Sequence, residues 1–399
     1  MLLGCGSGEV VEAQGGESST TEGSMDTGGT SGGASTTATS TSDTTASATA
    51  SGEGSTTSST SEGLDGTTTS SSDGLDDGSD DSTGGEPLGP VASCYEGVFV
   101  NDPDLGPDYD QFDPVVGSHC LGTNHQDIVG VDRVVFLGDS ITVGTPPSWP
   151  NQFYRSRLAN ALRDEFGLSY GFLESLWKSY DPFNGTASVR QAGDFWSCAR
   201  WGGRNDDLLE DDTQLEDCFP PNTWDQRTLA IVTSGGNDIA NLTRKAIDGV
   251  PQAELWDQAI EMIAYKQDAI EWMKDPQRFP NGNFVVFANI YEFTDATGDV
   301  QSCDVSGLAG FEEPVPSPDE LAEVVTWIEE EYMRMAVETG SDMIFLFEEF
   351  CGRGFNYDDP TAPCYRGPGE QRWFDLTCTH PNPTGHQAIA NMFMAVVEE

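Results

Sequence analysis

Basic residues are scarce in this chain: 18 Lys and Arg stand against 67 Asp and Glu, a formal net charge of -49 at pH 7 over 399 residues. This charge argues against a nucleic-acid partner, because phosphates would be repelled over most of the surface. Attraction to an anionic membrane by charge is not expected either. The sequence also lacks an apolar run of about 18 residues, so it predicts no membrane span.

Aromatic residues, lysine and arginine are absent from residues 6–89, which consist mainly of Ser, Thr, Gly, Asp and Glu. Such a segment cannot bury enough apolar surface to offset its ordering entropy, and it is predicted to be a disordered acidic tether. Residues 90–399 contain all nine Trp and every other aromatic residue of the chain. They are long enough for one domain with a single large core.

No CxxC pair is present among the nine cysteines. Eight of them lie in residues 90–399, namely Cys94, Cys120, Cys198, Cys218, Cys303, Cys351, Cys364 and Cys378. An even number at irregular spacing predicts disulfides in an oxidising compartment, with a pairing that the sequence leaves open. Unpaired buried thiols are the alternative, and the short paired spacings of a zinc site are missing.

Cys5 follows Leu-Leu-Gly and precedes the polar tether. Residues 1–5 resemble the lipobox of bacterial lipoproteins, in which this cysteine is lipidated and becomes the mature N-terminus. Too few residues precede Cys5 for a signal peptide, so the resemblance requires a start further upstream, and a chance match is the alternative. The resemblance implies an exported protein, at the cell surface or in the periplasm, that is anchored to the membrane through a lipidated Cys5.

Apolar runs and helical patterns alternate from residue 134 onward. Strands are expected at 134–137, 170–173, 228–238, 283–290 and 343–350, and helices at 151–167, 254–273, 318–338 and from 384. This alternation predicts a three-layer α/β/α domain with a central, mainly parallel sheet. Sites in such domains lie at the carboxyl ends of the strands, and the cysteine-bearing stretches 175–218 and 302–316 are expected to fold over that end as loops.

Ser140 follows the first predicted strand in "FLGDSITVG". A serine hydroxyl is a weak nucleophile until a base accepts its proton, so it needs a histidine. His119 and His125 precede the strand, whereas His380 and His386 open the last helix in "HPNPTGHQAIA". Taken singly, Ser140 could be a helix N-cap and His380 a buried histidine of the core, and Asp139 is expected to shape the turn.

Three blocks, "FLGDSITVG", "SGGNDI" and "HPNPTGHQAIA", resemble in this order the SGNH or GDSL family of hydrolases, over residues 131–399. The resemblance implies that Ser140 attacks the acyl carbon and that His380 is its base. It implies an oxyanion hole made by the backbone N–H of Ser140, the backbone N–H of Gly202 and the side-chain amide of Asn237. Gly203 is the adjacent option for the glycine, and no cofactor or metal is implied.

The acid departs from the family pattern. The family has Asp three residues before the histidine, where this chain has Thr377, and the nearest acid is Asp375. We expect Asp375 to complete the triad, with two extra residues in "DLTCTH" accommodated by a disulfide at Cys378. A Ser–His dyad, with a backbone carbonyl orienting the imidazole of His380, is the alternative.

The expected activity is that of a serine esterase that hydrolyses a small-molecule or polysaccharide ester, for instance an acetyl group on extracellular polysaccharide. A lysophospholipase or thioesterase is one alternative, and a non-catalytic carbohydrate-binding module that keeps the fold is another. Four tryptophans near the blocks suit sugar rings or flat acyl groups, although core packing explains each of them equally well: Trp149, Trp196, Trp201 and Trp373.

Overall fold

The computed structural model describes residues 87–210 and 213–399. Residues 1–5 and most of the predicted tether lie outside this range. The central sheet has the strand order β4-β5-β1-β6-β7-β8, and every neighbouring pair is parallel except β4 with β5. Its strands are β1 (Arg133–Gly138), β4 (Gln191–Ala192), β5 (Phe195–Ser197), β6 (Thr228–Thr233), β7 (Phe284–Ala288) and β8 (Asp342–Ile344). A separate hairpin pairs β2 (Tyr180–Asp181) with β3 (Thr186–Ala187).

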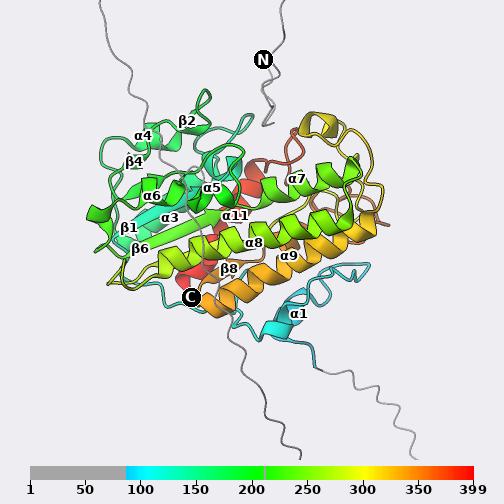
Figure 1. The fold of residues 1–399 in the computed structure, drawn as a ribbon, viewed down its shortest axis with the longest axis horizontal. Helices are drawn as coiled ribbons and strands as arrows, with labels where there is room; N and C mark the ends of the chain where they lie inside the picture. The colour runs from blue at the N-terminus through cyan, green and yellow to red at the C-terminus, as the bar shows by residue number, and fades with distance from the viewer. Residues whose placement is uncertain (1–86, 211–212) are drawn as a thin grey trace, which may run out of the picture. The chain divides into compact units, whose positions relative to one another are not determined.

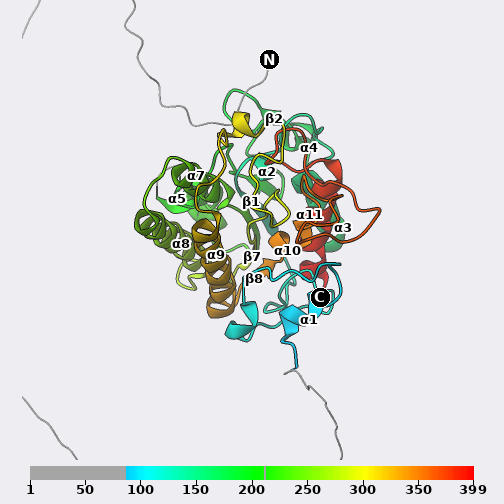
Figure 2. The ribbon, with the colours of Figure 1, turned by 90° about the vertical axis from the view of Figure 1, so that its right-hand side faces the viewer.

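Helices cover both faces of the sheet: α5, α7, α8 and α9 lie on one side, and α3 and α11 on the other (Figures 1 and 2). The helices are α1 (Pro90–Tyr95), α2 (Ser140–Val143), α3 (Tyr154–Phe166), α4 (Glu174–Lys178), α5 (Asp206–Leu209), α6 (Gln214–Cys218), α7 (Gly236–Ile247), α8 (Gln252–Lys274), α9 (Pro318–Thr339), α10 (Leu346–Phe350) and α11 (Pro383–Glu398). Short 3₁₀ turns are η1 (Tyr109–Phe112), η2 (Pro221–Thr223) and η3 (Ser306–Ala309). The predicted three-layer architecture is confirmed.

The two middle strands, β1 and β6, are buried along their whole length. Helices on both faces remove water from both sets of side chains, which explains why these strands are apolar runs without alternation. Phe136, for example, is completely buried between Tyr154 of α3 and Trp177 of α4. Truncating such a side chain to alanine typically costs about 3–5 kcal/mol of unfolding free energy, so this core holds the strand ends in place.

Three of the expected strands differ in the structure. The strand expected at 228–238 ends at Thr233, and α7 begins at Gly236. Residues 170–173 form a turn with Gly171 at φ +60°, and the Tyr170 ring stacks on Phe195 with 4.4 Å between centroids. The apolar run 343–350 divides into the end of β8 and helix α10. The run 343–350 is apolar because most of its side chains face the core, and burial alone does not distinguish a strand from a helix. In the turn at 170–173, by contrast, Phe172 is 95% exposed.

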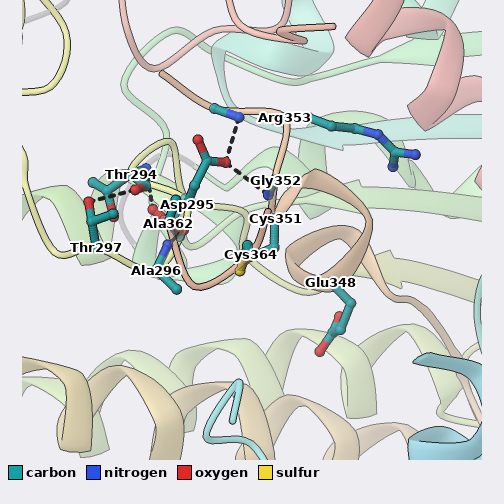
Figure 3. Close-up of a disulfide and its surroundings, with 12 residues drawn as sticks. Thr294, Asp295, Ala296, Thr297, Glu348, Cys351, Gly352, Arg353, Ala362 and Cys364 are labelled. Carbon is teal, nitrogen blue, oxygen red and sulfur yellow. Dashed lines mark hydrogen bonds between the residues drawn. A yellow bond between two sulfur atoms is a disulfide. The ribbon is translucent and has the colours of Figure 1, made fainter. Parts of the chain in front are cut away.

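All eight cysteines of residues 90–399 form disulfides: Cys94–Cys120, Cys198–Cys218, Cys303–Cys378 and Cys351–Cys364. The predicted disulfides are confirmed, and they are typical of an exported protein. Figure 3 shows one of these loops, in which Asp295 accepts a hydrogen bond from the backbone N–H of Gly352 beside the Cys351–Cys364 bridge. The backbone N–H of Gly354 donates to the same carboxylate oxygen. No helix within residues 87–210 and 213–399 is long and apolar enough to cross a membrane.

Candidate active site

Ser140 is the first residue of α2, and Asp139 alone separates it from the end of β1. Asp139 caps this short helix, because its carboxylate accepts the N–H of Ile141 at 3.0 Å. Burial raises the pKa of Asp139 to about 7. As the first helical residue, Ser140 has a backbone N–H that no residue of the helix accepts, and this N–H remains available to a bound ligand.

His380 lies in the loop before α11 and contacts the serine. Its Nε2 is 2.8 Å from Ser140 Oγ, and both side chains are buried. Burial also lowers the pKa of His380 to about 4, so the imidazole is neutral at pH 7. A neutral imidazole at this distance is able to accept the serine proton.

Asp375 is brought into the site but does not contact the imidazole directly. The hydroxyl of Thr377 lies between them, 2.7 Å from His380 Nδ1 and 2.6 Å from Asp375 Oδ1. The same carboxylate oxygen accepts the backbone N–H of Thr377 at 2.7 Å. The two extra residues of the loop explain this arrangement, because they allow Asp375 to close a turn around Thr377 instead of facing the ring. Sequence reasoning missed Thr377, although it occupies the position where the family has its Asp.

Asn237 reaches the same edge of the sheet from the first turn of α7. Its Nδ2 donates to the carbonyl of Gly203 at 3.0 Å, and its second N–H is left for a ligand. Gly203 N–H donates to the Arg200 carbonyl at 3.1 Å. Gly202 is exposed, with φ +76°, and its N–H has no acceptor among the residues that the structure describes. The geometry therefore favours Gly202 over Gly203 as an oxyanion donor.

A buried polar network that sequence reasoning also missed supports this edge. Lys266 of α8 donates to the hydroxyl of Ser234 at 2.8 Å, and that hydroxyl donates to Asn205 Oδ1 at 2.8 Å. Burial lowers the pKa of Lys266 to about 7, against the attraction of Asp238 and Asp139. The network ties the end of β6 to the loop that contains Gly202. An isolated lysine on a helix has no sequence signal that distinguishes it from a surface residue.

The four tryptophans have different environments. Trp149, in the loop after α2, is 70% exposed. The other three contact their own chain: Trp196 packs on Arg133, Trp201 donates its indole N–H to Gly144, and Trp373 packs on Arg353. Trp149 is the most exposed of the four, and the other three are half-buried. His386 is buried, and its Nδ1 accepts the N–H of Tyr154 at 3.2 Å, which is a structural role.

Residues 136–388 match the family model of the GDSL-like Lipase/Acylhydrolase family. The chain belongs to this family. The matched residues run from β1 into α11 and contain the serine, asparagine and histidine described above. As a GDSL-like acylhydrolase, the protein is a hydrolase that acts on ester bonds.

Solved structures of low sequence identity resemble this GDSL-like chain. A gut microbial diltiazem-metabolizing enzyme is 16% identical, with 69% of this chain and 49% of that chain covered, at a TM-score of 0.41. An acetyl xylan esterase is 15% identical over 66% of this chain and 99% of that chain, at 0.37. An extracellular lipase from Streptomyces rimosus is 18% identical over 67% of this chain and 100% of that chain, at 0.37. The chain thus spans about half the length of the first of these. No curated protein sequence matches it.

Proposed function

We propose that the chain is a serine esterase that hydrolyses carboxylic esters through an acyl-enzyme on Ser140. The observation that carries the proposal is the 2.8 Å contact between His380 Nε2 and Ser140 Oγ. His380 accepts the serine proton as Oγ attacks the acyl carbon, and it then donates that proton to the leaving alcohol. Water, deprotonated by the same imidazole, releases the acid and restores the serine.

The tetrahedral intermediate carries a negative charge on the former carbonyl oxygen. In this proposal the backbone N–H groups of Ser140 and Gly202 and the side-chain amide of Asn237 donate to that oxygen. These donors are already held in place, Asn237 by the Gly203 carbonyl at 3.0 Å. Fixed donors stabilise the developing charge without reorganisation, which is commonly the largest contribution to this type of catalysis.

We infer a short acyl group, such as acetyl on an extracellular polysaccharide, as the substrate. One observation supports the polysaccharide part of this inference. The exposed ring of Trp149 suits stacking on a sugar.

The test is hydrolysis of p-nitrophenyl acetate, butyrate and octanoate by the oxidised full chain, beside Ser140→Ala. We expect turnover that falls with acyl length and is lost in Ser140→Ala, and release of acetate from an acetylated polysaccharide. A preference for octanoate would instead identify a lysophospholipase or thioesterase. Absence of turnover on every ester, together with retention on the polysaccharide, would identify a binding module and contradict the proposal.

A lipid anchor at Cys5 and export to the cell surface complete the proposal, since the four disulfides require an oxidising compartment. The test is mass spectrometry of the protein from its native membrane fraction. An acylated N-terminal cysteine is the expected result, and an unmodified N-terminus from a soluble extracellular fraction would contradict the anchor alone.

A further inference from the structure

The imidazole of His380 has a hydroxyl rather than a carboxylate on its Nδ1 side. Thr377 Oγ1 is within hydrogen-bond distance of both His380 Nδ1 and Asp375 Oδ1. A hydroxyl has one hydrogen, and an ionised carboxylate only accepts. Thr377 therefore donates to Asp375, and its oxygen accepts the Nδ1–H of His380. This direction fixes the tautomer, because Nε2 is then unprotonated and faces Ser140 at 2.8 Å.

We propose that Thr377 is a positioning residue that couples the charge of Asp375 to His380 through its hydroxyl, in place of a direct contact between carboxylate and imidazole. The inference rests on the proposed function, in which His380 accepts the proton of Ser140. When Nε2 takes that proton, the ring becomes cationic while Nδ1 keeps its own proton. The hydrogen bonds from Nδ1–H to Thr377 and from Thr377 to Asp375 then stabilise the new charge.

Among the residues that the structure describes, the Asp375 carboxylate accepts hydrogen bonds from Thr377 alone. Its Oδ1 accepts both the N–H and the hydroxyl of Thr377, and its buried Oδ2 has no partner among the residues described. Asp375 and His380 are each about 5% exposed. Hydrogen bonds polarise one another more strongly in such a low-dielectric environment than in water. The hydrogen bonds that link the Asp375 carboxylate to His380 therefore run through Thr377.

The loop that presents Thr377 is held from three sides. Cys378 is bonded to Cys303, and the hydroxyl of Tyr291 donates to the Thr379 carbonyl at 2.6 Å. Backbone N–H of Asp375 donates to the His380 carbonyl at 2.9 Å, which closes the turn. The position of the Thr377 hydroxyl therefore depends on the whole loop, and replacing the side chain alone leaves these contacts in place.

Other titratable groups lie near the hydrogen bonds that link His380, Thr377 and Asp375, and their charges can affect the pH dependence of the activity. Burial raises the pKa of Asp375, and the two hydrogen bonds from Thr377 and, to a smaller extent, the charge of Arg372 lower it. Tyr291 has a pKa raised well above its usual value by burial and by the charges of Asp139 and Asp375. His386, one turn along α11, has a pKa lowered to about 3 by burial. None of these three residues, Arg372, Tyr291 and His386, is substituted in the variants below.

The test compares five variants of the full chain on the best p-nitrophenyl ester, over a pH range: Thr377→Val, Thr377→Ser, Asp375→Asn, Thr377→Val with Asp375→Asn, and Thr377→Asp with Asp375→Asn. Valine removes the hydroxyl at nearly constant shape, and asparagine removes the charge but keeps an oxygen that accepts the Thr377 N–H. Each single variant should therefore keep the turn from Asp375 to Thr377, and the thermal unfolding temperature of each variant checks that the fold is retained.

We expect kcat/KM to fall about 10- to 100-fold in Thr377→Val, which leaves the Nδ1–H of His380 without an acceptor, and in Asp375→Asn, which removes the charge that stabilises the imidazolium. Serine should recover most of the activity. The double variant with valine should lose little more than either single change, because both remove the same coupling. Thr377→Asp with Asp375→Asn should restore activity and move the acid limb of kcat/KM to higher pH, because a directly adjacent carboxylate raises the pKa of an imidazole.

Activity in Thr377→Val equal to that of the unchanged chain would overturn the inference. Losses that multiply in the double variant would overturn it as well, because they would show that Asp375 acts independently of Thr377. The inference would also be overturned if the acid limb of kcat/KM stayed at the same pH in Thr377→Asp with Asp375→Asn. Each of these outcomes differs from failure of the proposed function, in which the unchanged chain and Ser140→Ala hydrolyse the esters equally slowly.

Discussion

The amide of Asn237 gives the sharpest test of the oxyanion hole. Replacing Asn237 with alanine removes one of three proposed donors to the tetrahedral intermediate. Loss of one such donor costs about 2.7–4 kcal/mol of transition-state stabilisation, which is about 10²- to 10³-fold in kcat. KM should change little, because the contact forms mainly in the transition state.

Stability is expected to change much less than activity. In the folded protein Asn237 is half-buried and donates a single hydrogen bond to the Gly203 carbonyl, at 3.0 Å, and a bond of this kind contributes about 1 kcal/mol. Asn241→Ala is the matched control, because Asn241 lies one turn further along α7. The control should retain kcat.

The assay is steady-state hydrolysis of p-nitrophenyl acetate, with thermal unfolding measured in parallel. Asn237→Asp should lose at least as much activity as Asn237→Ala, because an ionised carboxylate cannot donate to the oxyanion and repels it. The reasoning is refuted if Asn237→Ala keeps kcat within about threefold of the unchanged chain, or if Asn241→Ala loses as much.

Three further predictions concern the surroundings of the site. Gly203→Ala should destabilise the fold by about 1–3 kcal/mol in denaturant unfolding, since a Cβ there would lie 2.8 Å from a backbone oxygen; Gly202→Ala has open space around it but should also destabilise the fold, because alanine is strained at φ +76°. Removing Cys303–Cys378 should cost about 2–5 kcal/mol and also lower kcat, whereas removing Cys94–Cys120 should lower stability alone. Because burial lowers the pKa of His380 to about 4, the imidazole stays neutral as the pH falls through 6.5, and kcat/KM should persist to about pH 5; a loss centred near 6.5 would contradict this.

The layers of the fold were predictable because burial on both faces leaves a clear sequence pattern. The apolar run at 134–137 lies within β1, and the pattern from residue 384 lies within α11. The short strand β5 was not predicted, since three residues carry no periodicity. β5 lies beside β1 because Val134 pairs with Phe195, a residue far along the chain. The sequence around either residue does not indicate this long-range pairing.

The meeting of two candidate site residues at one edge of the sheet could be predicted because each of them follows a parallel strand. Ser140 and Asn237 follow β1 and β6, whose parallel pairing ends with Gly138 beside Thr233, so both reach the same edge. The Asp375 carboxylate was expected on the imidazole and instead lies behind Thr377. That difference depends on how a six-residue loop closes, which is determined by the Cys303–Cys378 bridge and by hydrogen bonds within the loop.

The most direct measurement of the central claim is covalent labelling of the full chain with a fluorophosphonate, followed by peptide mapping. We expect a single adduct on Ser140, formed rapidly in the unchanged chain, slowly in His380→Ala, and not at all in Ser140→Ala. Labelling of another residue, or labelling of Ser140 at an equal rate without His380, would contradict the claim that His380 activates Ser140.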